Sequence, residues 1–181
     1  MLRPKRTIAE RCARFFRARS GAAAVEFALI APFFFLLLFG MCEISLIGFA
    51  QVNLDSAAFE LARGIRTGES ENVSASTMQA NLCTAMTQIM PVSCNNLYLD
   101  VKSFPSFVDA SGLGLGTPIA NGQLQTGTFG YSPGTASDIV VVRAYYQWHV
   151  VTPMFQAVFG NVGGSDRLLV STIMFRSEPY K

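Results

Sequence analysis

The sequence predicts an α+β protein: a long N-terminal membrane-spanning helix, and beyond it a small periplasmic head that combines a helix with an antiparallel sheet. Two observations favour this fold class. An apolar stretch over residues 22–50 is long enough to cross the roughly 30 Å hydrocarbon core of a bilayer. Later segments, 97–104 and 139–151, alternate sides in the way that half-buried strands do.

The charges of the chain are divided unevenly. Residues 1–20 of the basic leader (1–21) hold seven basic groups and one acid, whereas residues 22–181 hold seven basic and eleven acidic groups. The excess of positive charge places the leader in the cytoplasm and the chain after about residue 50 across the membrane. A basic block can also bind nucleic acid, but this one directly adjoins a hydrophobic span, so we expect no nucleic-acid partner.

The apolar stretch is predicted to remain as an anchor. A secretory signal has an apolar region of about 7–15 residues that ends in a small-residue cleavage site. Here the apolar character runs from Phe27 to Cys42, resumes after Glu43 and reaches Ala50, with no Ala-x-Ala site after it. Pro32 lies inside this helix, where a membrane helix tolerates it.

Helical spacing continues beyond the membrane as an amphipathic extension over residues 51–68. We expect one helix from about Ala22 to Arg66, stopped by Thr67 and Gly68. Its apolar face must be covered, and the best cover is one face of the strand 139–151. The helix face comprises Leu54, Ala57, Ala58, Leu61 and Ile65, and the strand face comprises Val140, Val142, Ala144, Tyr146, Trp148 and Val150.

The head, residues 69–181, is predicted to contain a helix over about 76–90 and strands over 97–104, 139–151 and 168–176. The opposite face of the second strand carries Arg143, Gln147 and His149 and is expected to be partly solvated. Residues 111–136 are rich in glycine. No Gly-Lys-Ser/Thr follows a strand there, so a flexible surface loop or a wide hairpin connection is expected rather than a phosphate-binding loop.

Two cysteines of the head, Cys83 and Cys94, lie on the side of the membrane where disulfides persist. We favour a disulfide between them over two free thiols. A zinc site would need more ligands than these two and the distant His149. No combination of nucleophile, base and acid stands out, so we expect no enzyme activity, no cofactor and no metal.

One carboxylate stands inside the apolar stretch. Glu26 is the only charged residue from Ala22 to Cys42, and ionisable groups at such positions are costly and usually functional. It follows Gly21 by five residues and is followed by Phe27. Glu43 lies about one membrane thickness further on. We interpret Glu43 as an interfacial residue, the alternative being a polar contact between packed helices.

Three segments resemble the TadE-like minor pilins, or pseudopilins, of the tight-adherence (Tad/Flp) pilus system. The first, 19–32, has the layout of a type IV prepilin processing site: basic residues, Gly21, four small residues, then Glu26 and Phe27. The second is the alanine-rich stretch 55–68. The third is the ending, 175–180, where relatives often carry Arg-Asn-Glu-Pro and this chain has Ser177 in place of the asparagine.

This resemblance implies a pilin-like protein, a minor pilin or pseudopilin of a Tad-type (type IVb) pilus, acting in pilus assembly, adhesion or secretion. A prepilin peptidase would cut between Gly21 and Ala22, and Glu26 would pair with the Ala22 ammonium of a neighbouring subunit. The implied partners are the prepilin peptidase, other pilins or pseudopilins and the Tad assembly platform. The implied location is the bacterial inner membrane in a single pass, and the extracellular pilus after assembly.

The alternative hypothesis is a periplasmic enzyme or ligand-binding module held by an uncleaved signal anchor. The two hypotheses differ at Gly21, because only a pilin loses its leader there.

Overall fold

The computed structural model describes residues 21–70, 72–111 and 117–179. The basic leader up to residue 20, the glycines at 112, 114 and 116, and Tyr180 of the third resembling segment lie outside these ranges. The chain divides into two compact units, residues 1–41 and 42–181, and each is described by itself.

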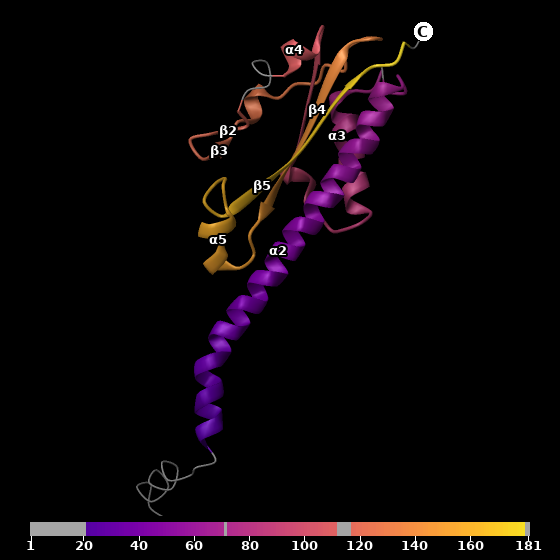
Figure 1. Cartoon of the computed structure of the whole chain (residues 1–181). Helices are drawn as coiled ribbons and strands as arrows, with labels where there is room; N and C mark the ends of the chain where they lie inside the picture. The colour runs from indigo at the N-terminus through magenta and orange to yellow at the C-terminus, as the bar shows by residue number, and fades with distance from the viewer. Residues whose placement is uncertain (1–20, 71, 112–116, 180–181) are drawn as a thin grey trace, which may run out of the picture. The chain divides into compact units, whose positions relative to one another are not determined.

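The predicted long helix is present. Helix α2 extends from Ala22 to Arg66 and contains Pro32 (Figure 1). Within the first unit its surface is apolar and exposed, as in Phe27 and Phe33, whose exposed fractions are 66% and 76%. Among the described residues, α2 is the one helix that length and composition make able to cross a membrane.

The head contains a three-stranded antiparallel sheet in the order β1-β4-β5. Strand β1 (Leu97–Phe104) has the predicted bounds, β4 (Ile139–His149) ends two residues earlier than predicted, and β5 (Asp166–Arg176) begins two residues earlier. In the register, Val142 of β4 lies between Val101 of β1 and Ile173 of β5. All three predicted strands are therefore confirmed.

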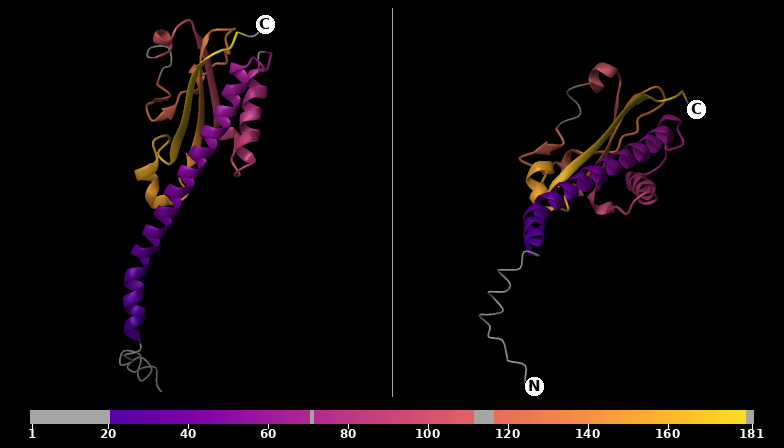
Figure 2. Two further views of the ribbon diagram at one scale, coloured as in Figure 1. Left: turned by 45° about the vertical axis from the view of Figure 1, so that its right-hand side comes forward. Right: turned by 60° about the horizontal axis from the view of Figure 1, so that its bottom comes forward.

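One face of this sheet packs on the outer half of α2 and on helix α3 (Ala75–Thr87), as the two views in Figure 2 show. The predicted cover of the helix face is confirmed, because the helix face belongs to one buried cluster with Val140, Val142, Ala144 and Tyr146, and Trp148 packs against that cluster. Ala58 and Leu54 of α2 and Val142 of β4 have no exposed surface. Burial of this size is the main favourable term in folding a small head.

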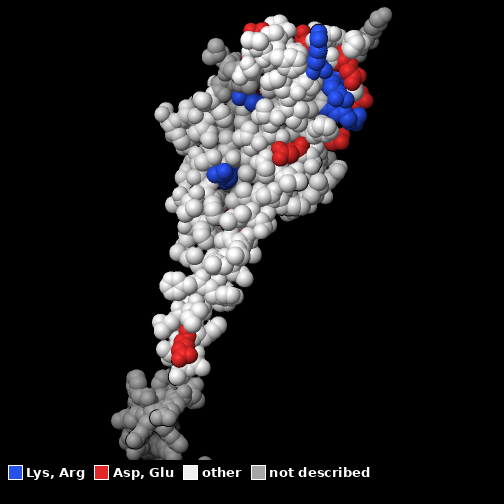
Figure 3. Space-filling view, in the orientation of Figure 1, with Lys and Arg blue, Asp and Glu red and all other residues white. Residues whose placement is uncertain are grey.

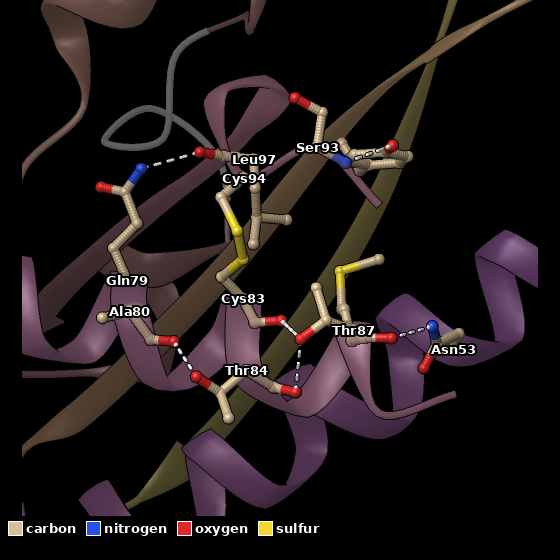
Figure 4. Close-up of a disulfide and its surroundings, with 11 residues drawn as sticks. Asn53, Gln79, Ala80, Cys83, Thr84, Thr87, Ser93, Cys94 and Leu97 are labelled. Atoms are coloured by element: carbon tan, nitrogen blue, oxygen red, sulfur yellow. Dashed lines mark hydrogen bonds between the residues drawn. A yellow bond between two sulfur atoms is a disulfide. The ribbon is translucent and has the colours of Figure 1, made fainter. Parts of the chain in front are cut away.

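Helix α3 is fixed at both ends. It begins after Ser74, whose hydroxyl accepts a hydrogen bond from the Thr77 amide, as an N-cap residue does. It ends at Thr87, three residues before the predicted end. The predicted disulfide between Cys83 and Cys94 is present and joins α3 to the short 3₁₀ helix η2 (Cys94–Asn96) that precedes β1 (Figure 4).

The second face of the sheet is covered around Arg143 and Tyr145 and solvated toward the end of β4, where Gln147 is half-buried and His149 is exposed, so the predicted partial solvation is confirmed. Tyr145 has no exposed surface, and the Phe129 ring stacks on it with a centroid distance of 4.8 Å. The cover comes from the short elements between β1 and β4. These are α4 (Phe107–Ala110), β2 (Ile119–Ala120), β3 (Gln123–Leu124) and η3 (Thr126–Thr128).

Residues 111–136 lie in the connection between the antiparallel neighbours β1 and β4, so the predicted wide hairpin connection is confirmed, and its described part contains short elements of its own. Strands β2 and β3 pair as a small hairpin whose turn residues, Asn121 and Gly122, have φ values of 53° and 70°. A two-residue turn with both φ values positive matches the twist of the strands that it joins.

A buried ion pair lies on the same face. Asp100 of β1 has a fully buried side chain and faces Arg143 of β4, whose Nε donates to Oδ2 at 3.1 Å. The other oxygen, Oδ1, accepts from the Gly130 amide at 2.9 Å. Next to it, the Val101 amide donates to the Gly130 carbonyl and the Ser132 amide donates to the Val101 carbonyl, each at 2.8 Å. The 130–132 backbone therefore lies along the outer edge of β1.

Candidate processing and assembly site

The proposed cleavage point lies where α2 begins. Gly21 directly precedes Ala22, the first residue of the helix. A Cβ atom added at Gly21 would meet nothing within 4 Å, and the residue has no positive φ that would favour glycine. The described part of the chain therefore gives no steric or conformational reason for a glycine at this position.

Glu26 lies in the second turn of α2 and is exposed. Its immediate neighbours in sequence, Val25 and Phe27, are 61% and 66% exposed, and Ala22 and Ile30 lie one turn away on the same side. Figure 3 shows an acidic patch on an otherwise uncharged helix surface. Within the described ranges, Glu26 has no ion-pair partner.

This combination has a chemical consequence. A carboxylate on an apolar helix is costly inside a bilayer unless a positive charge or hydrogen-bond donors meet it. A partner for Glu26 must therefore come from lipid headgroups, from the leader, or from another molecule. An anion near the first turns of a helix is also favoured by the helix dipole.

Glu43 is buried against the head. Its exposed fraction is 3%, and its carboxylate accepts four hydrogen bonds from the end of β4 and the turn beyond it. Oε1 accepts from Trp148 Nε1 at 3.3 Å and from the Val151 amide at 3.2 Å. Oε2 accepts from the amide and the hydroxyl of Thr152, at 3.2 and 3.0 Å.

The carboxylate of Glu43 is thus an internal tie of the head, and the interpretation of Glu43 as an interfacial residue stays a prediction. The carboxylate joins α2 to the N-cap residue of helix α5 (Pro153–Phe159). Sequence reasoning missed this role because the partners lie more than a hundred residues downstream. The one available signal was Thr152-Pro153, which is typical of a helix start.

Other candidate groups do not form a reactive centre. His149 is on β4, as predicted, and its Nδ1 lies 2.8 Å from Oδ1 of Asp166 on the neighbouring strand. Across the part of the chain that the structure describes, no group of three or more His, Cys, Asp or Glu side chains is placed to hold a metal ion. Cys42 is a free, exposed thiol.

The described residues combine a long apolar helix, with a carboxylate near its start, and an α+β head. The model of the family described as TadE-like protein matches residues 21–63, which is less than half of the chain. The match includes Gly21, Glu26 and Glu43 and ends within α2. No curated protein and no solved structure matches the chain.

The family match confirms the TadE-like resemblance over this region. It supports a pilin-like protein associated with the Tad pilus. The long apolar helix is consistent with a single-pass anchor.

Proposed function

We propose that the chain is a minor pilin or pseudopilin of a Tad-type pilus, cleaved by a prepilin peptidase after Gly21 and acting in pilus assembly, adhesion or secretion. The observation that carries this proposal is the spacing of Gly21, Glu26 and Phe27 at the start of an apolar helix, within the family match. The partners are the peptidase, other pilins or pseudopilins, and the Tad assembly platform.

Cleavage would change the charge of the N-terminus completely. It removes residues 1–21 with all seven basic groups of the leader and creates an ammonium group on Ala22. Because nothing within the described residues crowds Gly21, its small size is best explained by the access that a peptidase of the membrane plane requires. A large side chain at this position would obstruct the enzyme and leave the fold of the head unaffected.

The new ammonium would supply the positive charge that Glu26 lacks. In a helical stack of subunits, Glu26 of one chain would meet the Ala22 ammonium of a neighbour. Each charge would be costly to hold in an apolar environment alone, and the pair neutralises both. The exposure of Glu26 supports this role, because its side chain is accessible from outside the helix.

The proposed location is the bacterial inner membrane, with the leader in the cytoplasm and the head in the periplasm, and the extracellular pilus after assembly. The basic leader supports this orientation. The disulfide between Cys83 and Cys94 also supports it, because such bonds persist in the periplasm and are rare in the cytosol.

Processing is tested by mass spectrometry of the membrane-extracted protein from cells with an active prepilin peptidase. We expect a mature chain that begins at Ala22, and no processing of Gly21→Phe. Gly48→Phe is the matched control, because Gly48 lies in the same helix and also has open space around a Cβ atom. A wild-type chain that keeps residues 1–21 would overturn the proposal and favour an uncleaved anchor.

The role of Glu26 is tested separately. Glu26→Ala should insert at least as well as wild type, because it removes the cost of a carboxylate in the membrane segment, which is about 3 kcal/mol at a helix centre and smaller near an end. Its incorporation into pili should nevertheless be lost. Glu26→Gln keeps the size and polarity of the side chain and should fail in the same way if the charge matters. Normal piliation in both variants would exclude the pairing.

A further inference from the structure

A second apolar surface lies at one end of the head, on and before helix α5. Val151, Met154 and Val158 are 66%, 68% and 69% exposed and follow one another at helical spacing. Residues 150–165 include no charged residue. Exposed apolar groups that gather in this way, without charges among them, mark a contact site.

The opposite side of α5 holds it to the head. The rings of Phe155 and Phe159 stack, with centroids 5.5 Å apart. Gln156 donates a hydrogen bond to the Val150 carbonyl at 3.1 Å, and Arg167 of β5 donates to the Phe159 carbonyl at 3.5 Å. The partly buried aromatic side of α5 thus faces the protein, and its apolar aliphatic side faces outward.

The position of α5 along the chain is set by Glu43. Its carboxylate binds the Val151 amide and the Thr152 amide and hydroxyl, so the start of α5 lies beside α2 one residue after Cys42 (Figure 1). From Ala22 to Cys42 there are 21 residues, or about 31 Å of helix at 1.5 Å per residue. This length matches the roughly 30 Å hydrocarbon core.

If the hydrocarbon core covers residues 22–42 of the apolar stretch 22–50, its far boundary falls where α5 is tied to α2. We infer that α5 and Val151 form an interfacial lipid-binding element, whose aliphatic side chains enter the bilayer surface beside the end of the membrane span. This inference rests on the proposed anchoring of α2. Interfacial helices of this kind bury their apolar side to a depth of about 5–10 Å. Residues 150–165 carry no charge and Arg167 is the cation bonded to the end of α5, so we expect apolar contact to contribute more than attraction to anionic lipid.

The test uses the full chain with Cys12 and Cys42 replaced by serine, kept oxidised so that the disulfide of the head remains. An environment-sensitive fluorophore is attached at V158C or, as a second site on the same surface, M154C. The matched control is V108C. Val108 is 82% exposed on α4, which packs near Ile139 at the other end of β4. Each protein is reconstituted into phosphatidylcholine vesicles that contain lipid brominated near the headgroup.

Lipid-borne bromine should quench the fluorophore at positions 158 and 154 several-fold more than at position 108, and high salt should not reverse the difference. An inserted chain with equally weak quenching at all three positions would overturn this inference alone. Quenching at position 158 could also decrease as the protein-to-lipid ratio rises, because a second chain shields the fluorophore. That result would support lipid contact in the isolated subunit. Weak quenching even in dilute vesicles, with cross-linking between V158C copies, would assign the surface to another subunit and overturn the inference.

Insertion is measured first, by resistance to alkaline carbonate extraction. A chain that is extracted would overturn both the anchoring proposal and the inference that rests on it. If the chain resists extraction, the quenching experiment tests the α5 inference alone. Failure of the anchoring proposal and failure of the α5 inference are therefore distinguishable.

Discussion

Replacing Glu43 by alanine should destabilise the head more than any other single loss of a carboxylate on α2. The change removes an acceptor for four hydrogen bonds from Trp148, Val151 and Thr152. A hydrogen bond to a charged group contributes about 1.5–3 kcal/mol, and a buried donor left without a partner costs about 1–3 kcal/mol. If all four donors were fully buried, these contributions would add to a large loss in the free energy of unfolding.

Two observations reduce the expected effect. Val151 is 66% exposed, so water can replace the carboxylate at its amide. Three of the four bonds measure 3.2–3.3 Å, at the long end of the usual range. We therefore expect a loss of about 2–4 kcal/mol in the free energy of unfolding, most of it from the Trp148 and Thr152 donors. Glu43→Gln keeps one carbonyl oxygen and should lose about half as much.

The assay is urea unfolding of the full chain in detergent micelles, followed by tryptophan fluorescence. Trp148 is the only tryptophan and is itself bonded to Glu43, so its emission reports on the site directly. With a denaturant slope of about 2 kcal/mol per molar, the midpoint of Glu43→Ala should fall by about 1–2 M.

Glu60→Ala is the matched control, because Glu60 lies on the same helix and is 67% exposed in a surface pair with Arg63. Its effect should stay within about 0.5 kcal/mol. Equal midpoints for Glu43→Ala and Glu60→Ala, with unchanged Trp148 emission, would refute the role of Glu43 as an internal tie.

Three further changes address the core, the disulfide and the pH dependence of the head. Ala58→Asp places an unpaired carboxylate in the core and should lower the melting temperature sharply. The control Ala80→Asp, on the exposed side of α3, should leave the melting temperature nearly unchanged. Equal melting temperatures for the two variants would mean that α2 does not pack on the sheet. Cys83→Ser opens a loop of about 12 residues and should cost roughly 2–3 kcal/mol in urea unfolding, as should reduction of the wild type; labelling of both thiols in the exported protein would contradict the disulfide. Burial raises the pKa of Tyr145 to about 12, so the unfolded chain, with a tyrosine pKa of about 10, loses its proton first. Stability should therefore fall as pH rises from about 10 to 12, and the fall should be smaller in Tyr145→Phe when urea midpoints are compared across that window.

The sequence predicted the regular elements well because each has a strong local signal. The unbroken apolar and helical spacing determined the length of α2, and alternation determined β1 and most of β4 and β5. The partner of the helix face was also predictable, because Ala58 and its neighbours and the even-numbered side of β4 were the two largest apolar faces beyond the membrane.

The covered part of the second face of the sheet could not be predicted in the same way. Alternation tells which side a residue is on, and it does not tell whether that side is covered. Arg143 suggested solvent, yet Asp100 on the paired strand neutralises it and Phe129 covers Tyr145 beside it. That cover comes from a glycine-rich segment whose few apolar residues gave little sign of packing.

The residues of the candidate site were also only partly predictable from the sequence. Gly21, Glu26 and Phe27 are neighbours in sequence and could be recognised together, and cleavage after Gly21 stays a prediction. Glu43 could be recognised as unusual, but its partners could not, because no local period relates it to Thr152.

The contact of the 130–132 backbone with β1 has a consequence for how copies of this protein can associate. An uncovered edge strand invites another strand to pair with it, which is a common route to aggregation. Here the outward-facing amide and carbonyl of Val101 already form hydrogen bonds with Gly130 and Ser132. The carboxylate of Asp100 also accepts a hydrogen bond from the Gly130 amide. At Val101 the outer edge of β1 therefore has no free main-chain donor or acceptor for an incoming strand. Pairing of another strand at this point of the β1 edge is therefore blocked, and β5 is the other edge strand of the sheet.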